Sequence, residues 1–270
     1  MQRHYPDAVR TGQHRITFTG TGGEALAGTL DLPPKEPEAY ALFAHCFTGG
    51  KDNHATRRVS RALTDRGLAV LRFDFTGVGD SGGEFAHATF SSNVADIVLA
   101  AAHLREHFTA PSLIIGHSLG GAAVLAAAGD IPEVRAVVTI GAPSDPAHVA
   151  HLFEHALTDI EHAGEAEVSL GGRLFRIRRE FLEDLREQRL ANHITRLGKP
   201  LLVLHSPDDE IVDITNAAGI YTAARHPKSF IALDGANHLL TSPLHAKRVA
   251  QLIAAWADPY LPESFTPEID

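Results

Sequence analysis

Residues 112–126 read Ser-Leu-Ile-Ile-Gly-His-Ser-Leu-Gly-Gly-Ala-Ala-Val-Leu-Ala. An apolar run of strand length comes first, a segment of small helix-forming residues comes last, and a GxSxG pentapeptide joins them. A sharp turn from a buried strand into a helix strains the backbone and lifts the hydroxyl of Ser118 above the sheet. Glycines flank such a turn because a Cβ there would collide with the neighbouring chain. The pattern predicts a nucleophile at Ser118; the simpler alternative is a glycine-rich start of a helix without chemistry.

Apolar runs of strand length alternate with helical patterns from Tyr40 to Trp256. This alternation predicts an α/β fold with a mostly parallel sheet and helices on both faces. The first two strands should be antiparallel, because a short glycine-containing turn joins them. The eight expected strands are residues 15–19, 26–32, 39–45, 69–73, 113–115, 136–140, 201–205 and 229–233.

The regular alternation breaks between about residues 145 and 197. Two helical patterns lie there around a hairpin that is predicted at Gly171-Gly172. We therefore expect a single domain over residues 1–270, with a small helical cap inserted at about 145–197 above the carboxyl ends of the strands. The apolar faces of this cap should line an acyl pocket, with Phe153 and Leu157 as substrate-binding residues.

A serine hydroxyl is a weak nucleophile, so it needs a base to take its proton and an anion to hold that base. The strand 201–205 runs into an acidic loop, Ser206-Pro207-Asp208-Asp209-Glu210, and sites on parallel sheets lie at this end of the strands. The last strand ends in Asp234-Gly235-Ala236-Asn237-His238. His238 is the candidate base, although the chain has 17 histidines and an ordinary loop histidine is the alternative.

Acyl transfer also needs N–H donors for the negative oxygen of the transition state. The strand 39–45 leads into Cys46-Phe47-Thr48-Gly49-Gly50, at the edge of the sheet where the serine is expected. We predict that the backbone N–H groups of Phe47 and Leu119 form an oxyanion hole. The alternative is a glycine-containing loop without that function.

These segments together resemble the α/β-hydrolase superfamily. The resemblance rests on residues 45–49, 74–81, 116–121 and 235–238 and on Asp209, and it covers nearly all of the chain. Within the superfamily, the chain is most similar to the hydrolase half of bacterial proteins that fuse such a domain to an OsmC-like peroxiredoxin domain. The two cysteines of that second domain are absent, so no peroxidase activity is implied.

The resemblance implies the α/β-hydrolase fold and a triad of Ser118, Asp209 and His238 in the chain order of that superfamily. Asp209 is chosen over Asp208 because its spacing to Ile211 and Val212 matches the family pattern. Cys46, just before Phe47, departs from that pattern, since many relatives have glycine there.

The expected activity is that of a carboxylesterase-type serine hydrolase, which cleaves carboxylic esters of short to medium acyl chains through an acyl-enzyme. An amidase, thioesterase or lactone hydrolase with the same triad is one alternative. A non-catalytic binding module of the same fold is another. The substrate should be a small-molecule ester, and neither a cofactor nor a metal is implied.

The composition of the chain limits the classes of binding partner and the cellular compartment that we expect for it. A chain of 270 residues with 44% hydrophobic content can bury a full core. The net charge of −9, without a basic stripe, argues against a nucleic-acid partner. We find neither a signal-peptide pattern nor an apolar stretch of about 18 residues, which favours a cytoplasmic protein without membrane contact. The single cysteine agrees with a reducing compartment. The oligomeric state is left open, a homodimer included.

Three further patterns compete with this interpretation. The GxGxxG match at residues 77–82 is not followed by a helix, so we expect a structural loop in which Asp74 binds backbone groups, rather than a dinucleotide site. The HxxEH match at residues 103–107 lacks an evident third zinc ligand. A stripe at helical spacing in the cap is expected to be a solvated helix edge, with a pH-sensitive cap or an adventitious metal site as alternatives; it comprises His148, His151, His155, Asp159 and His162.

Overall fold

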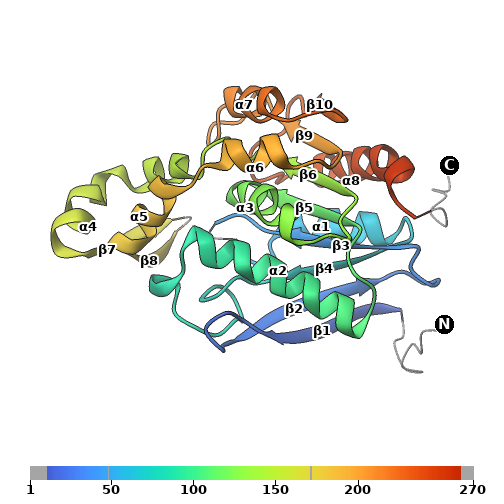
Figure 1. Ribbon diagram of the computed structural model, residues 1–270, viewed down its shortest axis with the longest axis horizontal. Helices are drawn as coiled ribbons and strands as arrows, with labels where there is room; N and C mark the ends of the chain where they lie inside the picture. The colour runs from blue at the N-terminus through green and yellow to red at the C-terminus, as the bar shows by residue number, and fades with distance from the viewer. Residues whose placement is uncertain (1–10, 48, 171, 263–270) are drawn as a thin grey trace.

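The computed structural model describes residues 11–47, 49–170 and 172–262. Its main feature is an eight-stranded sheet with the strand order β1-β2-β4-β3-β5-β6-β9-β10 (Figure 1). All eight strands expected from the apolar runs are present. They are β1 (Gly12–Thr19), β2 (Ala25–Leu32), β3 (Ala39–Ala44), β4 (Leu68–Phe73), β5 (Leu113–His117), β6 (Ala136–Ile140), β9 (Leu201–His205) and β10 (Lys228–Ala232).

The sheet is antiparallel at one edge and parallel elsewhere. β2 pairs antiparallel with both β1 and β4, whereas the five remaining strand pairs are parallel. Every residue of β3, β4, β5, β6 and β9 is buried. Burial on both faces explains why these strands read as continuous apolar runs rather than as alternating patterns. The predicted mostly parallel α/β sheet is therefore confirmed.

Helices cover both faces of the sheet and form a separate apolar core with each (Figure 1). Successive side chains of a strand point to opposite faces. In β5, accordingly, Leu113 and Ile115 belong to one core and Ile114 to the other. The first core includes α1 (His54–Thr64) and α8 (Pro243–Ala257); the second includes α2 (Phe90–His107), α3 (Leu119–Ala127) and α7 (Thr215–Ala223). Three short 3-10 helices complete this part: η1 (Phe85–His87), η2 (Ala128–Asp130) and η4 (Asp258–Tyr260).

Residues 145–197, which we call the cap segment, leave the sheet after β6 and return to it at β9. The segment projects to one side of the sheet in Figure 1, and its last helix packs against α3. The two strands of the predicted hairpin are present as an antiparallel pair in which Leu170 pairs with Arg173, whereas Gly171, at the predicted turn, lies outside the described residues. The elements of the cap segment are η3 (Pro146–Ala156), α4 (Leu157–Ala163), β7 (Glu165–Leu170), β8 (Arg173–Arg178), α5 (Arg179–Glu187) and α6 (Leu190–Arg196).

The predicted histidine stripe of the cap segment is not on one continuous helix, so that part of the sequence interpretation is wrong. Residues 146–156 form 3-10 turns, Phe153 has non-helical angles (φ −134°, ψ 33°), and the α-helix begins only at Leu157. The apolar face nevertheless points inward, since Val149, Phe153 and Ile160 are buried. Because both helix types repeat after three to four residues, the apolar spacing alone could not separate them.

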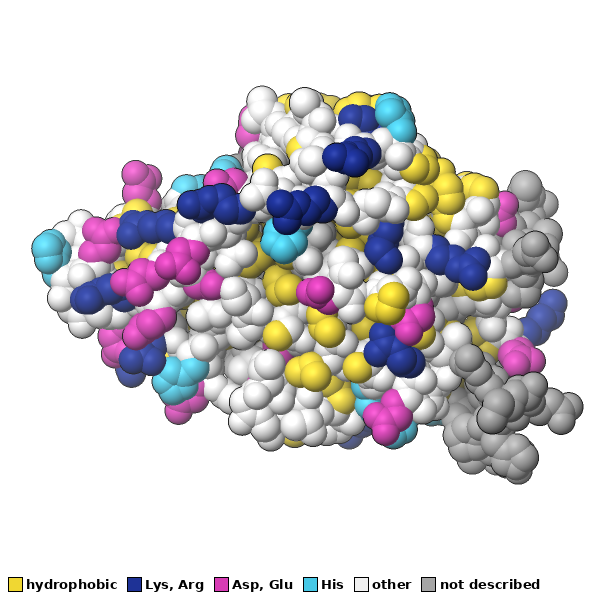
Figure 2. Space-filling model, in the orientation of Figure 1, with side chains coloured by type: hydrophobic (Ala, Val, Ile, Leu, Met, Phe, Trp, Pro, Cys, Tyr) yellow, Lys and Arg dark blue, Asp and Glu magenta, His cyan; other side chains and the backbone are white. Residues whose placement is uncertain are grey.

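Charges of both signs are interspersed on the face of the molecule that Figure 2 shows. Some surface charges of the molecule form ion pairs; Arg105, for example, donates two hydrogen bonds to the carboxylate of Glu133. Among the helices of the described ranges, none has the length and apolarity to cross a membrane.

Candidate active site

Ser118 occupies the sharp turn between β5 and α3 that its sequence predicts. Its backbone angles are φ 56° and ψ −128°, a region that residues with a side chain rarely adopt. A Cβ on Gly116 would lie 2.3 Å from the carbonyl oxygen of Gly120, and a Cβ on Gly120 would lie 2.3 Å from that of His45. The expected steric need for glycine on both sides of the serine is therefore present, and it comes from the close packing of α3 against the end of β3.

The structure brings Ser118, His238 and Asp209 together from three separate loops. Nε2 of His238 lies 2.9 Å from Oγ of Ser118, and Nδ1 of the same ring lies 2.8 Å from Oδ2 of Asp209. Only 2% of the Asp209 side chain and 6% of the His238 side chain are exposed, so little water competes for these contacts. The neighbouring Asp208 points elsewhere, since its Oδ2 accepts a hydrogen bond from the backbone N–H of Gly235 (3.1 Å).

The loop after β9 holds the Asp209 carboxylate in one orientation. Oδ1 accepts hydrogen bonds from the backbone N–H groups of Ile211 (2.9 Å) and Val212 (2.8 Å), which leaves Oδ2 for His238. Burial by itself raises the pKa of Asp209, but the hydrogen bonds from His238 and from the two amides outweigh it, so the pKa is lowered. The carboxylate is therefore ionised and able to stabilise a positive charge on the ring of His238.

Space for the Asp209–His238 pair comes from a glycine at the end of β6. Gly141 has φ +53°, a conformation that glycine adopts without strain. A Cβ at this position would lie 3.1 Å from Oδ2 of Asp209 and 3.3 Å from Nδ1 of His238. Any larger residue would crowd both members of the pair.

The two residues predicted to supply the oxyanion donors lie at the start of α3 and in the loop after β3. Leu119 is the first residue of α3, so its N–H is one of the first four of the helix, which have no acceptor inside it. Phe47 lies in the loop after β3, next to the point where the carbonyl of His45 approaches Gly120. The ring of Phe47 stacks on that of Phe181 in α5, with centroids 5.1 Å apart and planes at 19°. The loop after β3 thus packs against the cap segment through the ring of Phe47.

The predicted acyl-pocket residues lie in the cap segment beside this stack. Phe153 is completely buried, and its ring centroid is 6.5 Å from that of Phe181. Leu157 is half-buried and packs on the same core. Their part in substrate binding stays a prediction. Cys46 is no rival nucleophile, because burial raises the pKa of its thiol to about 11 and keeps it protonated.

Three buried histidines around the site were missed by the sequence interpretation. Nδ1 of His45 donates to the carbonyl of Cys46 (2.6 Å), Nε2 of His117 donates to that of His238 (2.7 Å), and Nε2 of His205 donates to that of Val212 (2.7 Å). Burial lowers the pKa of all three rings, that of His117 to about 3. A signal did exist in the sequence, since His117 and His205 end otherwise apolar strands and His45 directly follows one.

Residues in and beside the GxGxxG and HxxEH matches form contacts that stabilise the fold. In the GxGxxG loop, Asp74 accepts hydrogen bonds from the backbone N–H of Asp80 (3.0 Å) and from Nζ of Lys51 (2.8 Å), as the predicted structural loop requires. A Cβ on Gly79 would lie 2.3 Å from the Asp74 carboxylate. In the HxxEH motif, the ring of His103 packs on Phe18, 5.6 Å between centroids. Among the described residues, no three His, Cys, Asp or Glu side chains are grouped so that they could hold a metal ion.

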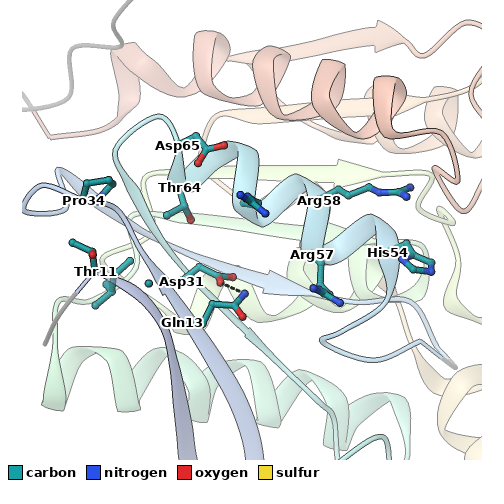
Figure 3. A pocket seen from close by; sticks show the side chains of 12 residues that line it. Thr11, Gln13, Asp31, Pro34, His54, Arg57, Arg58, Thr64 and Asp65 are labelled. Atoms are coloured by element: carbon teal, nitrogen blue, oxygen red, sulfur yellow. Dashed lines mark hydrogen bonds between the residues drawn. The ribbon is translucent and has the colours of Figure 1, made fainter.

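A cavity of about 560 Å³ opens beside β1, β2 and α1 (Figure 3). Asp31 and Gln13, joined by a 2.8 Å hydrogen bond, lie on one side, and the basic side chains of Arg57 and His54 lie on another. None of the described residues that line this cavity is a predicted site residue. In the sheet, β4 and β3 lie between β2 and β5, the strand that leads to Ser118.

Comparisons with known proteins identify the family and agree with the fold. The family described as serine aminopeptidase, S33, matches residues 36–166. The crystal structure of the esterase domain of a Rhodothermus marinus protein is 49% identical to this chain, with a TM-score of 0.77; the match covers 93% of this chain and all of that one.

Two curated relatives match over shorter stretches. Monoacylglycerol lipase from Mycolicibacterium smegmatis is 29% identical over 146 residues, which are 52% of this chain and 50% of the lipase. The mitochondrial palmitoyl-protein thioesterase ABHD10 from Mus musculus is 31% identical over 155 residues, which are 54% of this chain and 50% of the thioesterase. The chain thus spans about half the length of these two relatives. With the fold, the strand-turn-helix around Ser118 and the full-length match to an esterase domain, this chain belongs to the α/β-hydrolase superfamily and is a hydrolase of its esterase and lipase type.

Proposed function

We propose that this chain is a serine esterase that hydrolyses carboxylic esters of short to medium acyl chains through an acyl-enzyme on Ser118. The observation that supports this most directly is the pair of hydrogen bonds made by His238, 2.9 Å to Oγ of Ser118 and 2.8 Å to Oδ2 of Asp209. Such a chain of contacts gives the serine a base and gives the base an anion.

In the proposed reaction, Nε2 of His238 takes the proton of Ser118 while Oγ attacks the ester carbonyl carbon. The backbone N–H groups of Phe47 and Leu119 stabilise the negative oxygen of the tetrahedral intermediate, and Asp209 stabilises the imidazolium. His238 then protonates the departing alkoxide, which leaves as the alcohol. For deacylation, the same ring takes a proton from water while the water oxygen attacks the acyl carbon. The bond from that carbon to Oγ then breaks, the ring returns the proton to Oγ of Ser118, and the acid is released.

A fluorophosphonate probe tests the nucleophile, because only an activated serine attacks phosphorus rapidly. We expect one label on Ser118 and none on the Ser118→Ala variant, which should also lose ester hydrolysis. Ser144→Ala is the matched control: Ser144 is also half-buried, but its Oγ bonds to Asn216 (3.1 Å) and has no histidine base. Labelling of another residue, or activity in Ser118→Ala, would contradict the proposal.

A thioesterase is the second candidate, supported by the match to the mouse palmitoyl-protein thioesterase. The same triad serves both reactions, so the two candidates differ in the leaving group alone. A panel of p-nitrophenyl esters, acyl thioesters and anilides of equal acyl length separates them by kcat/KM. We expect the oxygen esters to be preferred; a kcat/KM at least tenfold higher for the thioesters would favour the second candidate.

A further inference from the structure

Two strands on either side of β6 end in a buried histidine, His117 in β5 and His205 in β9. His117 pairs with Ile140 and Ile140 pairs with Leu204, so both histidines lie at the carboxyl ends of neighbouring parallel strands, the end at which the site is built. Only 2% of His117 and none of His205 is exposed. A polar ring in an apolar core is costly unless it forms hydrogen bonds. The two positions therefore need a reason beyond packing.

Each ring donates one hydrogen bond to a backbone carbonyl of a site loop. Nε2 of His117 lies 2.7 Å from the carbonyl oxygen of His238, and Nε2 of His205 lies 2.7 Å from that of Val212. A carbonyl oxygen can only accept, so Nε2 carries the proton in both rings. Within the described residues, neither Nδ1 has a hydrogen-bond partner. A second proton there would be buried without an acceptor, so both rings are neutral.

The two accepting carbonyls belong to the loops that carry His238 and Asp209, and the relative position of these loops sets the contact between the two side chains. The first is the carbonyl of His238 itself. The second belongs to Val212, whose N–H holds Oδ1 of Asp209 while its carbonyl is held by His205. Nε2 of His205 also lies 3.6 Å from Oδ2 of Asp209, so its N–H dipole favours the carboxylate. Besides the contact of His238 with Asp209, the backbone N–H of Gly235 donates to Oδ2 of Asp208 and links the two loops.

We propose that His117 and His205 are positioning residues, which as neutral imidazoles fix the loops of His238 and Asp209 so that Nε2 of His238 stays within reach of Ser118. This inference rests on the proposed function of the site. Neither ring gains or loses a proton during the reaction. Because the rings hold the base and not the substrate, their loss should lower kcat and leave KM nearly unchanged.

The test compares two substitutions at each position. In His117→Gln and His205→Gln, the side-chain amide N–H can reach the place of Nε2–H and donate to the same carbonyl. In His117→Leu and His205→Leu, the donor is lost and the carbonyl stays buried. His103→Leu is the matched control, since His103 is a partly buried histidine that packs on Phe18 in another part of the fold.

The readouts are kcat and KM for p-nitrophenyl acetate, the rate of fluorophosphonate labelling, and the thermal unfolding midpoint. We expect the Leu variants to lose about 10- to 100-fold in kcat and in labelling rate, as a displacement of about 1 Å does, with KM within about twofold. The Gln variants should recover to within about threefold of wild type, and His103→Leu should match wild type. Folded Leu variants with unchanged kcat, or folded Gln variants no better than Leu, would overturn the proposal.

NMR of ¹⁵N-labelled histidine side chains covers the case in which a Leu variant does not fold. His117 and His205 of the wild-type protein should show the Nε2–H tautomer, unchanged between pH 8 and pH 5. The Nδ1–H tautomer, or protonation in that range, would overturn the proposal independently of activity. Failure of the fluorophosphonate to react with the wild-type protein would instead contradict the proposed function, so the two failures are distinguishable.

Discussion

Asp209→Asn changes the hydrogen-bond pattern of the site while keeping the shape of the side chain. The Asn carbonyl oxygen can still accept from the N–H groups of Ile211 and Val212, as Oδ1 of Asp209 does. The amide NH₂ then faces Nδ1 of His238, in place of the carboxylate oxygen now 2.8 Å away. An NH₂ group only donates, so Nδ1 must accept and the ring proton moves to Nε2. In that tautomer, His238 cannot take the proton of Ser118.

The expected loss is about 10⁴ in kcat, the effect of the same change in chymotrypsin-type proteases. At about 1.36 kcal/mol for each factor of ten, this is about 5.4 kcal/mol of lost transition-state stabilisation. The fold should survive, because both backbone hydrogen bonds to the side chain remain. Hydrolysis of p-nitrophenyl acetate gives kcat, and a thermal melt of the same sample gives the unfolding midpoint.

Asp208→Asn is the internal control for this prediction. Its Asn oxygen can still accept from the N–H of Gly235, so kcat should stay within about tenfold of wild type. If a folded Asp209→Asn variant kept kcat within tenfold, or if Asp208→Asn were the more damaged of the two, the assignment of the acid would be refuted.

Four further predictions follow from the site and its surroundings. EDTA should leave ester hydrolysis unchanged, because the proposed mechanism uses no metal; loss of activity that zinc restores would contradict it. Leu157→Trp should change the ratio of kcat/KM for acetate and octanoate esters by about tenfold, with little change in kcat for acetate. Equal effects on all acyl lengths would show that the cap segment does not determine the preference for acyl length. Gly141→Ala should lower kcat at least tenfold, because its Cβ would lie 3.1 Å from Oδ2 of Asp209 and 3.3 Å from Nδ1 of His238. The positive φ of this position should also destabilise the fold by about 1 to 2 kcal/mol in urea titrations. A variant that is as active and stable as wild type would refute both expectations. The free energy of unfolding should fall as pH drops below 6.5, because His117 stays neutral in the fold down to a pKa of about 3 whereas its unfolded form gains a proton near the usual pKa of 6.5. The contribution of His117 to this loss approaches about 1.4 kcal/mol per pH unit. Urea titrations at pH 7, 6 and 5 should therefore show a smaller change of the unfolding free energy with pH for His117→Gln than for wild type, and an identical change would exclude this contribution.

The strands could be predicted from the sequence because burial on both faces leaves a continuous apolar run. The run at Leu201–His205 and the run at Leu113–His117 are examples, and both end at the site. Local pattern could not give the order in which strands pair. That β4 lies between β2 and β3 depends on contacts between segments far apart in the chain.

Within the site, the predicted and the missed residues differ in the kind of signal they carry. The turn at Ser118 has a local steric signature, since glycines must flank it, and sequence shows it. His117 and His205 share only a weak signal, since each ends an apolar strand, and the carbonyls they contact, 121 and 7 residues away along the chain, cannot be inferred from it. The kink at Phe153 has no signature, because the apolar spacing stays compatible with a helix on both sides of it.

The stacking of Phe47 on Phe181 joins the chemistry of the site to the size of what it accepts. One residue supplies both the amide that faces the reacting carbonyl in our proposal and the ring that lies under α5. A bulky acyl group that pushes α5 outward would disturb this ring contact and, through the same Cα, tilt the amide away from the oxyanion. Such a ligand would still bind but would react slowly. Discrimination by the cap segment would then be kinetic, with misfitting esters acting as competitive inhibitors instead of being excluded.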